Sequence, residues 1–373
     1  MDATDEQDPG TRPRTVGEPT VGTPTVGALG ELAVLARVTR RLPSGSPLLG
    51  PGDDCAVVAA PDGRFVVTTD MMVHGPDFRW AWSSPEDVGW KAAATNLSDV
   101  AAMGAVPSGL VVAIAAPQET PVTVLEGIAD GFRTAIDALA PGIGVVGGDL
   151  STSATFSLTV TAFGDLGGRT PVLRSGARPG DVLAVSGELG PAARGLARLF
   201  RDGVDAAGEP DADRVRASGA DTDPDVARQR RPVPPIADGP LAAGAGATAM
   251  LDLSDGLAID AGRLARASGV TLELDVEPAL DPVALHGGED HGLLATFPAE
   301  AALPGGFRRI GVVRVRDDVG SGEAGHGDTG SYDTGSSDTA RGGTGRSVDL
   351  VRGGEVVPTT GWDPYADWDG AAG

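Results

Sequence analysis

Short apolar runs of strand length alternate along this chain with longer segments of helical character, and this alternation is the strongest limit on its fold. The runs FVVTTDMMV, SGLVVAIAA and FSLTVTAFGDL are typical of strands, whereas SSPEDVGWKAAATNLSDVAAMG and PVTVLEGIADGFRTAIDALA are typical of helices. Ser84 is a candidate N-cap of the first of these helices, with Pro85 in its first turn and Asp87 shortly after. Interleaved strands and helices predict an α/β or α+β fold.

The alternation continues beyond the segment GDLGGRTP, where we place a domain boundary near residue 167. We expect an N-terminal domain over residues 29–166 and a C-terminal domain over residues 167–373, since a chain of 373 residues suits two domains. Three stretches contain few apolar residues and bury too little to become ordered: 1–28, 202–234 and 317–347. The first is predicted to be a disordered tail, and the other two to be disordered insertions in surface loops.

Charge and composition exclude several classes of function. The formal charge is −23, from 52 acidic and 29 basic residues, so a nucleic-acid backbone is repelled. The single cysteine, Cys55, permits neither an internal disulfide nor a cysteine-rich zinc site, and the cytoplasm is the expected compartment. We expect no membrane association, because no run approaches the roughly 18 apolar residues of a membrane span. The single lysine, Lys91, lies outside any glycine-rich loop, so a Walker A phosphate loop is absent.

Acidic residues stand repeatedly at the ends of predicted strands, where ligand sites collect in open α/β sheets. If these loops converge, the carboxylates raise one another's pKa and destabilise the fold unless a cation neutralises them. Asp, Thr and Ser oxygens suit Mg²⁺, which commonly shares its coordination sphere with substrate phosphates. The residues concerned are Asp53, Asp54, Asp70, Asp149, Asp252 and Asp255, together with Thr68 and Thr69 beside Asp70 and with Asp99 of the segment NLSD.

Two further features would serve a bound phosphate. Gly147 and Gly148 beside Asp149 would let backbone N–H groups approach phosphate oxygens, and Arg174 would add a fork of donors.

Asp99 is notable because it falls within a predicted helix beside the small and apolar run VAAMG, where a carboxylate requires a partner.

Most of these residues also have a purely structural interpretation. Asp255 before Gly-Leu is a candidate helix N-cap, and Asp54 is a candidate turn former. Gly147 and Gly148 would equally suit a tight turn, and Arg174 could pair with a surface acid at small energetic value. The sequence patterns leave these alternatives open.

Eight ordered motifs together resemble the thiamine-monophosphate kinase family, part of the aminoimidazole ribonucleotide synthase-like ATP-binding superfamily. The motifs are GDDCAVV, TTDMMVHGPDF, GWKAAATNLSDVAAMGA, GVVGGD, VLRSGARPGD, LDLSDGLAID, GGEDHGLL and GWDPY. The resemblance implies a homodimer in which N-terminal domains pair their sheets, with a C-terminal α/β domain closing over the nucleotide. It also implies direct in-line, Mg²⁺-assisted transfer of the ATP γ-phosphoryl group to thiamine monophosphate, giving thiamine diphosphate.

The resemblance assigns roles to the residues at matching motif positions. It makes Asp149 and Asp255 the expected catalytic residues. It implies several Mg²⁺ ions, held by Asp54, Thr68, Thr69, Asp70, Asp99, Asp149, Asp252 and Asp255. The residues expected to contact ATP are Gly148, Asp149, Arg174 and Ser254, and those expected to contact the thiamine moiety are Asp77, Glu289 and Trp362.

The chain departs from the family pattern on the substrate side. Asp77 stands where many relatives carry His, and Gly-Glu-Asp is followed by His291 and Gly292 where relatives carry Tyr-Glu. The nearest alternative is an aminoimidazole ribonucleotide synthase-like enzyme, although the GEDH and GWDP segments favour the kinase. A non-catalytic divalent-ion-binding relative is a further alternative, against which the Gly-Gly segment and Arg174 speak.

Overall fold

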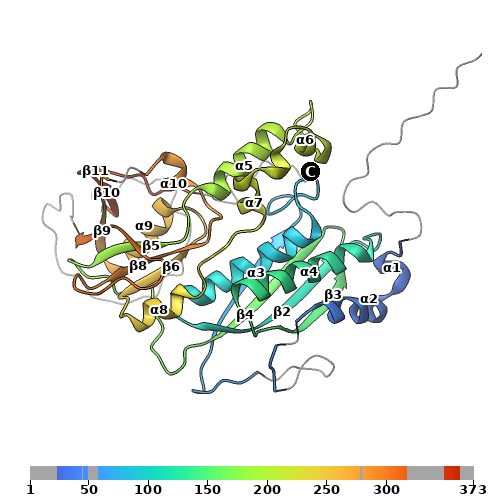
Figure 1. Ribbon diagram of the computed structural model, residues 1–373, viewed down its shortest axis with the longest axis horizontal. Coiled ribbons are helices and arrows are strands. Elements are labelled where there is room, and N and C mark those ends of the chain that lie inside the picture. The colour runs from blue at the N-terminus through green and yellow to red at the C-terminus, as the bar shows by residue number, and fades with distance from the viewer. Residues whose placement is uncertain (1–22, 44, 49–57, 278–279, 317–347, 362–373) are drawn as a thin grey trace, which may run out of the picture.

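Two β-sheets dominate the computed structural model, which describes residues 23–43, 45–48, 58–277, 280–316 and 348–361 (Figure 1). The first sheet has four strands in the order β1-β4-β2-β3: β1 (Val66–Val73), β2 (Val106–Ala116), β3 (Val145–Thr152) and β4 (Ser157–Asp165). The second has seven in the order β11-β10-β7-β9-β5-β8-β6: β5 (Val182–Ser186), β6 (Ala249–Leu253), β7 (Val270–Leu274), β8 (Gly292–Phe297), β9 (Arg308–Val315), β10 (Leu350–Arg352) and β11 (Glu355–Val356). The predicted mixed α/β class is confirmed, and the expected boundary near residue 167 falls in the connection between β4 and β5.

Two long helices, α3 (Pro85–Ala102) and α4 (Val122–Leu139), lie side by side over one face of the four-stranded sheet (Figure 1). The predicted start of α3 is confirmed as a capping box. The Ser84 hydroxyl accepts a hydrogen bond from the Asp87 N–H (3.2 Å), and the Asp87 carboxylate accepts one from the Ser84 N–H (2.9 Å). This cap fixes where α3 begins, and hence which of its residues face β1.

The segment GALGELAVLARVTRRL, residues 27–42, has a pattern that suggests one helix, but it is broken into three pieces. These are α1 (Val26–Leu29), α2 (Glu31–Val38) and a 3₁₀ turn, η1 (Thr39–Arg41). Gly30 separates α1 from α2 because its φ of 76° is incompatible with a continuous right-handed helix. The last residues of the predicted tail therefore have regular structure, whereas residues 1–22 and the predicted insertion at 317–347 lie outside the described residues.

One apolar core joins the two sheets. It includes Leu97 of α3, Ile128 of α4 and Leu158 of β4, and it continues into Met250 of β6 and Phe297 of β8. A second core lies around α9 (Leu257–Ser268) and the seven-stranded sheet, whose domain also contains α8 (Asp238–Gly244) and α10 (Pro282–His286). Because the first core crosses the junction, side chains from both domains are held at fixed positions there.

The prediction of disorder over residues 202–234 is wrong. The segment forms α6 (Ala212–Ala217), a 3₁₀ turn η2 (Ala220–Thr222) and α7 (Pro224–Arg230), which pack beside α5 (Pro191–Asp202). Val215 and Val226 are buried in a small apolar cluster with Leu199 of α5 and Trp82. Scattered charge suggested a solvated loop, but few apolar residues suffice when a neighbouring helix and an aromatic ring complete the cluster.

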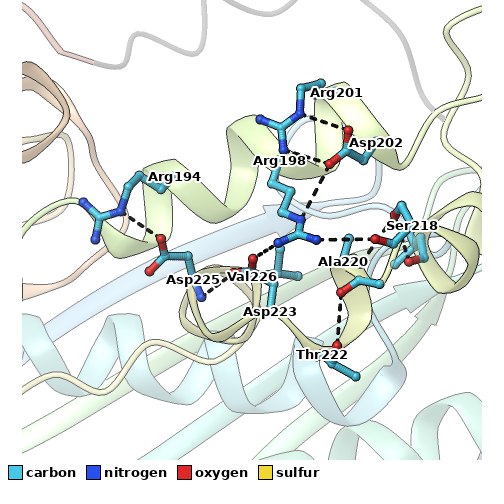
Figure 2. Close-up of polar contacts among 12 residues, drawn as sticks. Arg194, Arg198, Arg201, Asp202, Ser218, Ala220, Thr222, Asp223, Asp225 and Val226 are labelled. Atoms are coloured by element: carbon cyan, nitrogen blue, oxygen red, sulfur yellow. Dashed lines mark hydrogen bonds and ion pairs between the residues drawn. The ribbon is translucent and has the colours of Figure 1, made fainter.

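The charges of this segment pair with one another. Figure 2 shows Arg198 of α5 between Asp202 and Asp223, with its guanidinium also donating to the Ser218 carbonyl (3.4 Å). Asp223 also caps α7, since its carboxylate accepts from the N–H of Asp225 (2.8 Å). The Asp-Pro pair at the start of α7 is a helix start signal that the composition obscured.

None of the described helices combines the length and the apolar character that crossing a membrane requires.

If the helices after α5 pack as described, Leu199→Ala will destabilise the protein. Leu199 is fully buried, so the cavity left behind should lower the free energy of unfolding by about 2–5 kcal/mol. Urea denaturation would measure this, and limited proteolysis would show faster cleavage within residues 203–231. The matched control is Leu241→Ala on α8, where the side chain is 50% exposed and the change should stay within about 0.5 kcal/mol. Equal stability of the two variants would contradict this packing.

Candidate active site at the domain junction

Three predicted metal ligands meet where the N-terminal domain contacts β6. Asp70 comes from β1, Asp99 from α3 and Asp252 from β6. Burial, followed by the carboxylates of Asp252 and Asp70, raises the pKa of Asp99 to about 7. The Thr68 hydroxyl donates a hydrogen bond to Asp99 Oδ2 (2.7 Å), which opposes this rise. The expectation that converging carboxylates raise one another's pKa is therefore met at Asp99.

His291 provides a partner to this cluster that the sequence did not indicate. Its Nδ1 lies 3.5 Å from Asp252 Oδ2, and both side chains are buried. Burial lowers the pKa of His291, but the Asp252 carboxylate outweighs this effect and raises it above its ordinary value.

The donor set at the junction fits a hard divalent cation. Its oxygens come from carboxylates and from the Thr68 hydroxyl, which are ligands that Mg²⁺ prefers. Within the described ranges, no group of three or more His, Cys, Asp or Glu side chains has the spacing to enclose one metal ion. Asp54 lies outside the described residues.

Asp255 is held by an arginine and does not cap α9. Arg263 Nη1 donates to Asp255 Oδ2 (2.5 Å) and to Asp260 Oδ1 (2.6 Å). Asp260 Oδ2 in turn accepts from the N–H groups of Asp255 (3.1 Å) and Gly256 (3.2 Å), so Asp260 supplies the capping interactions from inside the helix. Burial raises the pKa of Asp260 to about 6 despite the nearby guanidinium. The N-cap interpretation of Asp255 is wrong, and its carboxylate is left with Oδ1 for another partner.

Gly147, Gly148 and Asp149 lie inside β3 rather than in a tight turn, so that alternative is also wrong. A Cβ on Gly148 would approach the Val112 carbonyl oxygen of β2 to 2.2 Å, which explains the glycine by close strand packing. Asp149 pairs with Ala113 of β2, and β3 is the edge of the sheet opposite β1. A single chain therefore does not bring Asp149 beside Asp70.

Three other predicted residues are placed separately. Thr69 Oγ1 donates to the Val160 carbonyl of β4 (2.9 Å), away from Asp99. Arg174 is exposed in the connection between β4 and β5, and no acid of the described chain lies within ion-pair distance of its guanidinium. The Ser254 carbonyl accepts from the Glu289 N–H (2.7 Å), which ties the loop after β6 to the loop before β8.

A cavity of about 550 Å³ lies beside the junction and contains two of the predicted substrate residues, Asp77 and Glu289. Its apolar lining comes from the loop before α3 and from α5, and includes Phe78, Trp82, Leu196 and Phe200. Gly361 also lines it, so the chain reaches this cavity immediately before Trp362, which lies outside the described residues.

The two acids of the cavity differ in their partners. Glu289 forms an ion pair with Lys91 of α3, whose side chain is almost fully buried. Asp77 Oδ2 accepts from the Val73 N–H (2.6 Å), and burial followed by the Glu289 carboxylate raises the pKa of Asp77. The pairing of Lys91 with Glu289 was not predicted from the sequence. A signal was available, because Lys91 is the single lysine of the chain and lies in a predicted helix among small and apolar residues.

The loop that carries Glu289 fits closely against the loop that carries Asp255. A Cβ on Gly288 would lie 2.7 Å from the Ser254 carbonyl oxygen, and a Cβ on Gly256 would lie 2.8 Å from the His286 carbonyl oxygen. The two loops must therefore approach without side chains at these points. The carboxylate cluster and the cavity are therefore adjacent, and these two loops connect them.

Known proteins share this organisation. Family models for the AIR synthase related protein match residues 52–166 with the N-terminal domain and residues 178–305 with the C-terminal domain. The thiamine-monophosphate kinase of Mycobacterium tuberculosis is 44% identical over 307 residues, which cover 76% of this chain and 85% of that protein. The chain belongs to the thiamine-monophosphate kinase family.

Solved members of the family have the same fold. Thiamine monophosphate kinase from Aquifex aeolicus superposes with a TM-score of 0.60 at 28% identity, covering 80% of this chain and 91% of that one. The complex of AaThiL with AMPPCP and TMP also superposes with a TM-score of 0.60, at 26% identity, covering 90% and 96%. The predicted membership of the thiamine-monophosphate kinase family is confirmed.

Asp99→Asn tests whether the junction is a cation site. At pH 8 without divalent ions the wild-type cluster holds repelling charges, so the variant should melt a few degrees higher, on the order of 1 kcal/mol in unfolding free energy. Added Mg²⁺ should raise the melting temperature of the wild type much more than that of the variant.

The matched control is Asp137→Asn on α4, whose side chain is 65% exposed and should leave both quantities unchanged. A lower metal-free melting temperature with an unaltered Mg²⁺ response would mean that Asp99 serves only as the acceptor for Thr68.

Proposed function

We propose that this chain is an ATP-dependent thiamine-phosphate kinase, which transfers the γ-phosphoryl group of ATP to the phosphate of thiamine monophosphate. The products are thiamine diphosphate and ADP. The observation that carries the proposal is the direct hydrogen bond between the Glu289 N–H and the Ser254 carbonyl, because it joins an acidic cation site to an apolar cavity. Family membership and the AaThiL complex with AMPPCP and TMP support the same reaction. We propose the cytoplasm as its compartment.

The chain contributes mainly position and charge to this reaction. Phosphoryl transfer requires in-line placement of the two anions and neutralisation of charge, with little covalent help from the protein. When bound, Mg²⁺ would supply that neutralisation and orient the phosphates. We assign its ligands to Asp54, Thr68, Thr69, Asp70, Asp99, Asp149, Asp252 and Asp255, with Asp149 and Asp255 most directly involved in the transfer. An acceptor phosphate is already a nucleophile, so no catalytic base is required.

We assign the two substrates to different parts of the site. ATP would contact Gly148, Asp149, Arg174 and Ser254, with Arg174 available as a donor because it is exposed. The thiamine moiety would occupy the cavity, contacting Asp77, Glu289 and Trp362. Aromatic walls suit flat heterocycles, and the carboxylates would face the positive charge of the thiazolium ring.

We further propose that the active unit is a homodimer formed through the outer face of the four-stranded sheet. Val67 and Met71 on that face are 57% and 61% exposed, which is unusual for large apolar side chains on one face of a strand. The strand register places Met71, Thr159, Ala113 and Asp149 in one row across the sheet. A two-fold axis parallel to the strands would lay β3 of one copy over β1 of the other. Asp149 of each copy would then complete the site of its partner.

The assay for the reaction itself is direct. Purified protein incubated with ATP, Mg²⁺ and thiamine monophosphate should form thiamine diphosphate and ADP in equal amounts, detected by chromatography. Omission of Mg²⁺ should abolish the product. Absence of product, together with turnover of formylglycinamidine ribonucleotide, would instead favour an aminoimidazole ribonucleotide synthase-like activity.

Mixing inactive variants tests the shared site. Asp70→Asn and Asp149→Asn should each be inactive, but a mixture refolded or coexpressed together should regain about a quarter of the wild-type activity, because half of the dimers contain one intact site. The control mixture pairs Asp70→Asn with Asp99→Asn, which belong to the same chain's half of the site and should not complement. Failure of the first mixture, with mixed dimers verified, would place Asp149 in the site of its own chain.

A further inference from the structure

Helix α5 is capped by a residue from a different part of the chain. Its own N-cap, Gly190, offers no side-chain hydrogen bond, and Pro191 in the first turn has no N–H group. Asp290 fills this role, since its Oδ1 accepts from the Ala192 N–H (2.8 Å) and its Oδ2 from the Gly190 N–H (2.5 Å). Both carboxylate oxygens are therefore engaged at the start of α5.

The backbone on each side of Asp290 is strained. Glu289 has a φ of 71° and His291 a φ of 53°, and they are the two non-glycine residues with positive φ in the described ranges. This conformation is costly for residues with a Cβ and persists only where surrounding contacts over-determine it. Here the Glu289 N–H donates to the Ser254 carbonyl (2.7 Å) and the His291 N–H to the Leu253 carbonyl (3.0 Å). The strained backbone directs the adjacent side chains of Glu289 and Asp290 to different partners.

These partners belong to two different walls of the same cavity. Glu289 enters the cavity and pairs with Lys91. Asp290 binds the start of α5, which supplies the facing wall through residues that include Leu196 and Phe200. The distance between the two walls therefore depends on Glu289 and Asp290, which are adjacent in one strained loop.

We propose that Asp290 is a positioning residue for the thiamine-phosphate substrate. It does not line the cavity, but it holds α5 at the distance from Glu289 that the substrate requires. Loss of its carboxylate releases α5 and the strained loop from each other, and the cavity loses its defined width. This inference rests on the proposed kinase function and adds a residue to which the sequence comparison assigned no role.

The test compares Asp290→Ala and Asp290→Asn with wild type in steady-state kinetics. The KM for thiamine monophosphate should rise about tenfold in Asp290→Ala and by less in Asp290→Asn, which keeps one acceptor oxygen. The KM for ATP should stay within about twofold, because none of the residues proposed to contact ATP belongs to α5. Calorimetric titration with thiamine monophosphate alone should show the same graded loss of affinity.

Asp211→Ala is the matched control. Asp211 is the local N-cap of α6 and also accepts from two N–H groups, those of Asp213 (2.7 Å) and Arg214 (3.1 Å), but α6 does not line the cavity. It should lower the melting temperature while leaving both KM values unchanged.

An inactive wild type would contradict the proposed function and not this inference. An active wild type with both KM values unaltered in Asp290→Asn, or raised equally, would overturn the positioning role. Should Asp290→Ala fail to fold, Asp290→Asn alone decides.

Discussion

Repulsion between carboxylates at the domain junction is the constraint on which the rest of the structure depends. Asp70, Asp99 and Asp252 come from three elements and two domains, and burial with mutual repulsion raises the pKa of Asp99 to about 7. Such a cluster would drive a flexible junction apart. The shared apolar core, which runs from α3 into β6 and β8, opposes this by fixing the elements that carry the acids. The negative charges of these carboxylates are thereby held together at a place where a cation would neutralise them.

The same junction determines the substrate cavity. The loop before β8 is bonded to the loop after β6, so displacement of the acids would displace Glu289 as well. Asp290 extends this connection to α5, and Lys91 extends it to α3. Four elements around one cavity are therefore coupled through hydrogen bonds and ion pairs rather than through apolar packing alone. This arrangement suits an enzyme that must place two anions in line, since small errors in position are costly.

Local signals in the sequence predicted the elements well and their partners poorly. The capping box at Ser84 and the strand at Val66–Val73 follow from residues a few positions apart, and both are confirmed. The helices after α5 were missed because their stability comes from Leu199 and Trp82, which lie outside the segment. The N-cap alternative for Asp255 is wrong because Asp260, one turn along α9, accepts from the N–H groups at the start of the helix, while Arg263 binds the Asp255 carboxylate.

The sequence by itself determined the mixed α/β class, the oxygen-rich acidic loops and, through eight ordered motifs, the family. These are properties of residue type and short-range order. Tertiary structure alone decided which charges meet, because Lys91 and Glu289 are 198 residues apart and pair only once α3 lies against the loop before β8. It also decided that Asp149 stands at the sheet edge opposite Asp70, since strand order is set by packing of whole elements and not by their position along the chain.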